Sequence, residues 1–242
     1  MNIQEYYRRR QELIEHQVKY RNLCSVCLQP EFGCYCKELR RFDPKIKFVI
    51  LIHPIEVKRR IATGRMSHLC LENSVLIKGQ DYTANDQVNE ILKNASCQSV
   101  VLYPGPKALN LSHVSAIEKK QILIPPKKLV VFVIDGTWAT ARRMIRQSQN
   151  LNVLPRICFT PRRLSQFRVR KQPAPECLST IEAIHHLIEH LGPAVGFDLE
   201  SREHDQLMVV FDKMVQRQLV FIQESYDNPK STSYRRPRFR VS

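Results

Sequence analysis

The sequence predicts an α/β fold, with a mostly parallel sheet covered by helices on both faces. Short runs of β-branched and aromatic residues alternate, from residue 45 onward, with stretches of helical spacing. Such alternation is typical of parallel strands joined by helices. The run LVVFVI at 129–134 is apolar throughout, as expected of a strand buried on both faces. At 242 residues and 43% hydrophobic content, the chain suffices for one medium domain and a small appendage.

The individual elements follow from apolar spacing and from the turn residues that bound them. Residues 1–21 carry a loose apolar stripe and several arginines, which predicts a basic helix. A first helix is expected from Pro54 through Arg59 and Arg60, because proline suits the first helical turn. The further strands and helices are predicted from the same criteria. Strands are expected at 48–52, 74–77, 99–103, 129–134 and 153–159, and helices at 86–94, 137–144, 179–191 and 204–224.

The charge of the chain indicates a polyanionic partner. Lys and Arg total 38 against 23 Asp and Glu, which gives a net charge of +15. Nucleic acid is the commonest partner of such a surface. The end of the chain holds no acid after residue 228 and places Tyr234 and Phe239 among cations, so it either grips RNA or is a solubilising tail. Its arginines are Arg235, Arg236, Arg238 and Arg240.

Targeting signals are not apparent in the sequence. No apolar run is long enough for a transmembrane helix, and residues 1–21 lack the apolar stretch of a secretory signal. Acidic residues in this segment also argue against a mitochondrial presequence. We therefore expect a cytoplasmic protein without a membrane partner.

Four of the eight cysteines lie in two close pairs, Cys24-x-x-Cys27 and Cys34-x-Cys36. This spacing predicts a tetrahedral zinc site. Disulfide bonds are the alternative, but no secretory signal places the chain in an oxidising compartment. Four thiolates leave no open position on the metal, so the predicted role is structural. The other cysteines are expected to be small core residues; they are Cys70, Cys97, Cys158 and Cys177.

Polar or turn residues follow three of the predicted strands. They are His53-Pro54-Ile55-Glu56 with Arg59, Tyr103-Pro104-Gly105, and Asp135-Gly136-Thr137-Trp138. Carboxyl ends of parallel strands share one edge of a sheet, so these residues are expected to form a pocket there. No glycine-rich phosphate loop follows any strand, which argues against NAD or a nucleoside triphosphate. The plainer alternative is that Asp135 caps the following helix and Trp138 fills the core.

Five motifs in order give the chain a resemblance to the DTW-domain family. They are the cysteine knuckle, the His-Pro-x-Glu segment, the Tyr-Pro-Gly turn, Asp135-Gly136-Thr137-Trp138 and Ser179-Thr180-Ile181-Glu182-Ala183. The resemblance implies an enzyme that moves the 3-amino-3-carboxypropyl group of S-adenosylmethionine onto a tRNA uridine. It also implies a SPOUT-like fold, with a trefoil knot in its C-terminal part. We accordingly divide the chain into a basic helix and zinc knuckle (1–43), a catalytic DTW domain (44–226) and a basic tail (227–242).

The resemblance also implies roles for individual residues. Asp135, Thr137 and Trp138 are the catalytic candidates, with Asp135 acting either as the base for uridine N3 or as an orienter of the sulfonium. Ser179 and Glu182 equally fit a helix capping box. The candidates for S-adenosylmethionine binding are Tyr103, Pro104, Gly105, Asp135, Gly136, Leu178, Ser179, Thr180 and Glu182. From their charge rather than from the resemblance, Arg59, Arg60 and the tail arginines are the candidates for RNA binding, although Arg59 equally fits the carboxylate of S-adenosylmethionine.

The expected products are acp3U in tRNA and methylthioadenosine. An RNA methyltransferase with the same donor, or a non-enzymatic zinc-containing RNA-binding protein, remains an alternative at this stage. Family members modify the variable loop or the D-loop, and the sequence does not distinguish between them. It also leaves the oligomeric state open.

Overall fold

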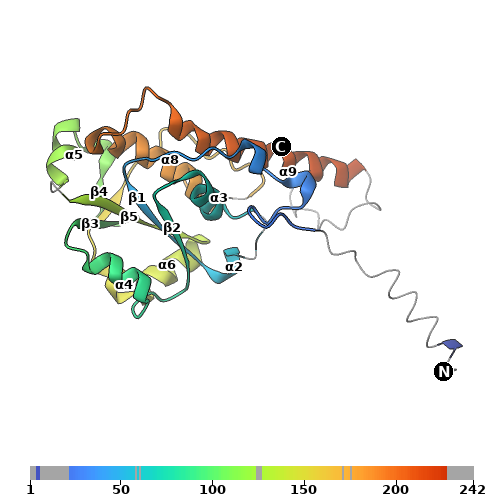
Figure 1. Ribbon diagram of the computed structural model, residues 1–242, viewed down its shortest axis with the longest axis horizontal. Helices are drawn as coiled ribbons and strands as arrows, with labels where there is room; N and C mark the ends of the chain where they lie inside the picture. The colour runs from blue at the N-terminus through green and yellow to red at the C-terminus, as the bar shows by residue number, and fades with distance from the viewer. Residues whose placement is uncertain are drawn as a thin grey trace.

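A single sheet organises the protein, as the computed structural model in Figure 1 shows. The structure describes residues 4–5, 22–57, 59, 61–123, 127–170, 172–174 and 176–227. Within them, six strands pair in the order β2-β1-β5-β3-β6-β4, and every pair is parallel. The strands are β1 Lys47–Ile52, β2 Ser74–Lys78, β3 Cys97–Leu102, β4 Leu109–Asn110, β5 Lys128–Asp135 and β6 Arg156–Cys158. The predicted α/β class with a parallel sheet is confirmed.

The strand β5 lies between β1 and β3 and places the ends of all three at one edge. Ile52 is in register with Asp135, and Leu102 is in register with Val133. The residues that follow these strands therefore emerge side by side. The last predicted strand, 153–159, is shorter than expected: residues 153–155 form the turn after α7, and β6 runs only from Arg156 to Cys158. The two-residue strand β4 had no sequence pattern to predict it.

Helices cover both faces of the sheet, with α8 and α9 on one side and α4 and α6 on the other (Figure 1). The helix predicted from Pro54 through Arg59 and Arg60 is shorter than expected: α2 ends at Val57. The last begins two residues late, after a 3-10 turn at Glu203–Asp205. The helices are α2 Pro54–Val57, α3 Thr63–Cys70, α4 Asp86–Lys93, α5 Ala116–Ile122, α6 Trp138–Gln147, α7 Gln149–Asn152, α8 Thr180–Leu191 and α9 Gln206–Asp227.

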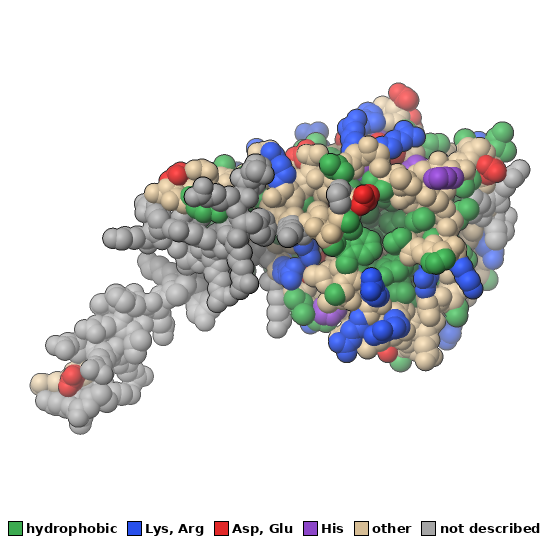
Figure 2. All heavy atoms as spheres, turned by 180° about the vertical axis from the view of Figure 1, so that it is seen from behind, with side chains coloured by type: hydrophobic (Ala, Val, Ile, Leu, Met, Phe, Trp, Pro, Cys, Tyr) green, Lys and Arg blue, Asp and Glu red, His purple; other side chains and the backbone are tan. Residues whose placement is uncertain are grey.

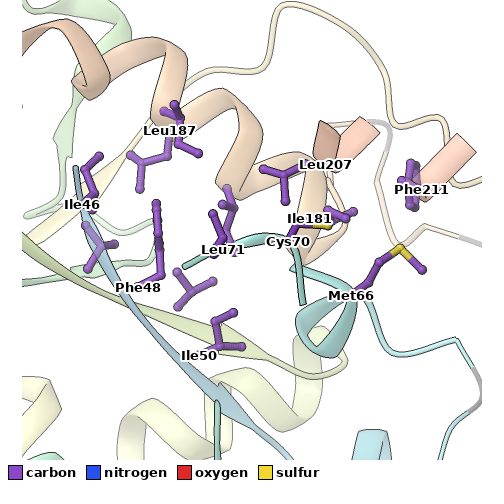
Figure 3. Close-up of a cluster of buried hydrophobic side chains, with 14 of the residues drawn as sticks. Ile46, Phe48, Ile50, Met66, Cys70, Leu71, Ile181, Leu187, Leu207 and Phe211 are labelled. Atoms are coloured by element: carbon purple, nitrogen blue, oxygen red, sulfur yellow. The ribbon is translucent and has the colours of Figure 1, made fainter. Parts of the chain in front are cut away.

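Alternate residues of the central strands supply two cores. Phe48 and Ile50 point toward α3, α8 and α9, and Figure 3 shows them facing Ile181, Leu187 and neighbouring apolar side chains. Val49 and Leu51 belong to the core on the opposite face, which includes residues of α4, α6 and α7. Both faces of the strands are thus buried, which explains their uninterrupted apolar sequences.

The cysteine knuckle packs against the last helix. Phe32 contacts Phe221 of α9 edge to face, with ring centroids 4.6 Å apart. Arg217 of α9 donates hydrogen bonds to the Cys34 carbonyl and to Glu38 Oε1. The cysteine knuckle and α9, which are distant in sequence, are therefore in contact at this surface.

Several predictions fall outside the described residues. These are the helix at 1–21, apart from Gln4 and Glu5, together with Arg60 and the tail arginines. The trefoil knot stays a prediction. None of the described helices is both long and apolar enough to cross a bilayer.

Candidate active site

A cavity of about 930 Å³ opens at the carboxyl ends of β3, β5 and β6. This volume is typical of a site for a small organic ligand. The lining combines the ends of the strands with the start of α8 and with the loop before it. Figure 2 shows one face of the molecule hollowed over hydrophobic side chains, with Lys and Arg around the hollow. The expected convergence of Tyr103 and Asp135 on one pocket is confirmed.

Asp135, the last residue of β5, lies in the wall of the cavity and is only 5% exposed. Its Oδ1 accepts a hydrogen bond from the Thr180 hydroxyl at 2.6 Å. Its Oδ2 is buried and has no hydrogen-bond partner among the described residues. A carboxylate oxygen in this position is costly unless a ligand or water satisfies it.

Burial raises the pKa of Asp135 to about 6, because desolvation disfavours the charged form. The hydrogen bond from Thr180 acts in the opposite direction, and the neighbouring Glu56 carboxylate raises the pKa further. Arg170 and the backbone amide of Gly64 lower it by smaller amounts, although the Gly64 amide does not reach Oδ2 with hydrogen-bond geometry. At pH 7 to 8 the group is therefore mainly ionised, yet it lies near the pH at which it takes up a proton. Such a carboxylate suits either stabilisation of a cation or acceptance of a proton.

Gly64, in the first turn of α3, lies directly against this carboxylate. A Cβ atom at Gly64 would stand 2.5 Å from Asp135 Oδ2, which is closer than atoms can approach. Only glycine allows α3 to begin here, so α3 and Asp135 are fitted to each other. The sequence TGRMSHLC gave no amphipathic signal for this helix.

The helix after β5 begins without help from Asp135. Thr137 is the N-cap of α6, and its hydroxyl accepts a hydrogen bond from the Thr140 amide at 3.2 Å. Trp138 is 39% exposed and lines the cavity, so it does not fill the core. The plainer interpretation of this motif, a capping aspartate and a core tryptophan, is therefore wrong.

Glu182 fixes the loop that forms another wall of the cavity. It is 3% exposed and accepts hydrogen bonds from the Ser179 amide and hydroxyl, as in the predicted capping box. It also accepts from the Ser165 hydroxyl at 2.8 Å and from the Gln166 amide at 2.7 Å. The carboxylate thus joins the start of α8 to the loop, but it does not line the cavity itself.

Two arginines that line the cavity pair with the same oxygen of one buried carboxylate. Glu56, 3% exposed, lies 3.0 Å from the Arg59 guanidinium and 3.7 Å from that of Arg170. Both arginines line the cavity and remain partly exposed. They are therefore held in place while keeping donors for an anionic ligand.

Most of the predicted site residues line this cavity. They are Arg59, Tyr103, Pro104, Asp135, Gly136, Thr137, Trp138, Leu178, Ser179 and Thr180. Gly105 and Glu182 do not line it, and neither does His53, whose Nδ1 accepts a hydrogen bond from the Ile55 amide.

Sequence reasoning missed several lining residues between β6 and α8, because that segment has no periodic pattern. They are Phe159, Pro161, Phe167, Arg170, Gln172 and Glu176. Cys158 and Cys177 also line the cavity, and Cys97 is half-buried, whereas only Cys70 of the isolated cysteines is a buried core residue.

The four predicted cysteine ligands come together in the knuckle. The Sγ atoms lie within 4.8 Å of one another, and the pairs Cys24–Cys36 and Cys27–Cys34 are each 3.6 Å apart. All four thiols are free, so the disulfide alternative is not supported. Thiolates about 2.3 Å from a tetrahedral zinc ion are about 3.8 Å apart. The cluster therefore fits a zinc ion, with a 2.8 Å backbone hydrogen bond from Cys24 to Gln29 closing its first turn.

Comparison with known proteins identifies the family of this chain. The model of the DTW domain matches residues 21–219. The "tRNA-uridine aminocarboxypropyltransferase 2" of Drosophila melanogaster is 31% identical over 169 residues, which cover 67% of this chain and 63% of that protein. The mouse (Mus musculus) protein of the same name is 26% identical over 70% of this chain and 56% of its own length. The chain thus spans about three-fifths of these two relatives.

A plant relative aligns over a larger share of both proteins. The "tRNA-uridine aminocarboxypropyltransferase A" of Arabidopsis thaliana is 23% identical over 87% of this chain and 86% of that protein. No solved structure gives a significant match.

Proposed function

We propose, from the premise that this chain belongs to the DTW-domain family, that it transfers the 3-amino-3-carboxypropyl group of S-adenosylmethionine to N3 of a tRNA uridine. The names of its relatives support the reaction, and the cavity supports the donor. The single observation that carries the proposal is Asp135, a buried carboxylate with one unpaired oxygen in the wall of an apolar cavity. A sulfonium is a cation that such a group would stabilise.

The reaction forms the N3–Cγ bond, breaks the Cγ–S bond and moves the N3 proton to an acceptor. Uridine N3 attacks the methionine Cγ, the Cγ–S bond breaks, and its electron pair returns to sulfur to give neutral methylthioadenosine. The N3 proton leaves as the new bond forms and needs an acceptor. Asp135, with a pKa of about 6, is our candidate for that acceptor or for the group that holds the sulfonium.

The other lining residues fit the remaining parts of the donor. Tyr103, Trp138 and Phe159 offer aromatic surface on which adenine or the target uracil would stack. Arg59 and Arg170, fixed by Glu56, would pair with the carboxylate of the amino-acid arm. That arm must bend toward the uridine, because displacement requires near-in-line approach of the reacting atoms.

The surroundings of the cavity suit a polyanionic substrate. α6 starts at Trp138 in the cavity wall, and its exposed arginines continue away from it. Two further exposed arginines follow Pro161 of the lining. Within the described residues these cations are Arg142, Arg143, Arg146, Arg162 and Arg163. We propose that they contact tRNA phosphates, together with the arginines of the C-terminal tail.

Zinc is proposed for the cysteine knuckle, with Cys24, Cys27, Cys34 and Cys36 as its ligands. With four thiolates bound, the ion would supply only structure. It would hold the short chain segment that packs against α9.

The test is equilibrium binding, at pH 8, of S-adenosylmethionine and of S-adenosylhomocysteine, which lacks the positive charge. We expect the protein to prefer the charged ligand and the variant Asp135→Asn to lose that preference about tenfold or more. S-adenosylhomocysteine, which lacks the sulfonium charge, serves as the control for an intact pocket. Equal preference in both proteins would show that Asp135 does not recognise the sulfonium.

A further inference from the structure

A second cluster of possible metal ligands lies between α8 and the turn before α9. His185 of α8 and Asp205 are in contact, with His185 Nε2 3.0 Å from Asp205 Oδ1. His204 Nε2 is 3.7 Å from the same oxygen. One ligand atom from each of the three residues lies within 4.8 Å of the others, and none of these residues lines the cavity.

His204 is the unusual member of this cluster. Its side chain is fully buried, and neither ring nitrogen has a hydrogen-bond partner among the described residues. The ring stacks on His185, with centroids 4.8 Å apart, and meets Phe197 edge to face. A neutral imidazole buried in this way leaves both a donor and an acceptor unsatisfied, which is costly. A bound ion would satisfy one of them.

We propose that His185, His204 and Asp205 bind a divalent cation of the zinc type. Imidazole nitrogens with one carboxylate oxygen are ligands that zinc prefers. Donors about 2.05 Å from a tetrahedral ion are about 3.3 Å apart. The two separations of 3.0 and 3.7 Å bracket that value. The third separation, between the two ring nitrogens, is within 4.8 Å, and the rings would have to tilt toward each other when the ion binds. A water would complete the four-coordinate site.

The neighbouring charges are compatible with this ion. Arg202 donates two hydrogen bonds of 2.8 Å to the Asp205 carboxylate, one to each oxygen. Each carboxylate oxygen has two lone pairs, so Oδ1 can bind an ion while Arg202 orients the group, as outer partners of metal ligands do. Asp205 is also 36% exposed on its side chain, which offers a route for entry.

The neighbouring trio His185, His186 and Glu189 is the alternative ligand set. The first set is favoured because it contains His204, whose buried ring nitrogens have no hydrogen-bond partner among the described residues. His186 already has a partner in Glu189, at 3.1 Å. The variant His186→Ala therefore distinguishes the two sets.

An ion at the proposed site would join the middle of α8 to the start of α9. The first residue of α8 is Thr180, whose hydroxyl binds Asp135. The site would therefore also fix the helix that positions the buried carboxylate, although its existence does not depend on the proposed reaction.

The experiment counts bound zinc by native mass spectrometry in the full chain, equilibrated with buffered Zn²⁺. We expect the wild-type protein to hold one more ion than His185→Gln and Asp205→Ala, and the same number as His186→Ala. The cysteine site is common to all four proteins, so the difference of one ion is independent of its occupancy. Circular dichroism checks that each variant is folded, and Asp205→Ala alters a partly exposed group if His185→Gln does not fold.

Cobalt supplies a second readout. Co²⁺ in the cysteine site gives intense thiolate charge-transfer bands, whereas the histidine and aspartate site gives weak ligand-field bands alone. We expect His185→Gln to lose the weak component and keep the intense one. The proposal is overturned if wild type and His185→Gln bind equal zinc, or if His186→Ala also loses one ion.

Discussion

Asp135 is a buried carboxylate, and its burial has a measurable effect on stability. Its pKa rises from 3.8 in the unfolded chain to about 6 in the folded protein. The folded state therefore binds the proton more tightly, and stability falls as the pH rises from about 4 to about 6. This rise of about two pKa units lowers the free energy of unfolding at neutral pH by at most about 3 kcal/mol.

Replacement of this charge should make the protein more stable. We expect Asp135→Asn to unfold at higher denaturant than wild type at pH 8, by up to about 3 kcal/mol, with the difference shrinking toward pH 4. Denaturant unfolding of both proteins at several pH values measures it, since all other titrations cancel. A difference that does not vary with pH would contradict the raised pKa.

Gly64 offers a test of the contact between α3 and the carboxylate. Gly64→Ala places a methyl group against Asp135 Oδ2, so we expect a loss of about 1–3 kcal/mol despite the better helix propensity of alanine. The matched control is Gly105→Ala, whose new Cβ would meet its nearest neighbour, Arg156, at 3.6 Å. Chemical denaturation of both variants and of wild type measures the difference. If Gly64→Ala were as stable as Gly105→Ala, α3 would not approach Asp135 as described.

At the scale of the element, two capping boxes among the described residues differ in burial and in the number of groups that the glutamate holds. Ser115 and Glu118 cap the exposed helix α5, while Ser179 and Glu182 cap α8 inside the protein. Glu118 bonds to its own cap alone, whereas Glu182 also holds Ser165 and Gln166. The same sequence motif is therefore expected to contribute differently to the stability of the protein at the two places.

We expect Glu182→Ala to cost about 3 kcal/mol, because four donors lose their acceptor and the two hydrogen bonds from Ser179 are buried. Glu118→Ala should cost about 1 kcal/mol, as exposed caps do. Urea unfolding of the two variants gives the comparison. Similar costs would show that Glu182 does not anchor the loop of the cavity.

Element prediction succeeded where local pattern and tertiary environment agree. Strands β1 and β5 carry long apolar runs because both of their faces are buried, so their sequences indicate them directly. The sequence of β3 indicates it through the shorter apolar run at 100–102. Helix α3 was missed because its buried side includes Thr63, Gly64 and Ser67, which carry no apolar period. Its burial arises from contacts with α8 and α9, which are distant in sequence.

The same division applies to the candidate site. Residues that follow predicted strands, such as Tyr103 and Asp135, could be placed at one edge of the sheet by topology alone. Arg170 could not, because it lies in an irregular segment and reaches the cavity through a contact with Glu56. Loop side chains of this kind are positioned by tertiary contacts and leave no periodic signal.

Across the whole molecule, the charged surface and the apolar cavity serve different parts of the proposed reaction. The net charge of +15 favours capture of a polyanion over any part of its length, whereas the cavity admits only a small group. Transfer requires both, since a uridine must reach the donor beside Asp135. The knuckle packs against α9 through Phe32 and Glu38.

The most direct test of the central claim is transfer of label to unmodified bulk tRNA from two preparations of S-adenosylmethionine. One carries label in the methyl group, and the other in the carboxyl carbon of the amino-acid arm. The account predicts that RNA acquires label from the carboxyl preparation alone, and that Trp138→Ala abolishes this transfer. Label from the methyl preparation alone would make the protein a methyltransferase, and no label from either would favour a binding protein; each result would contradict the account.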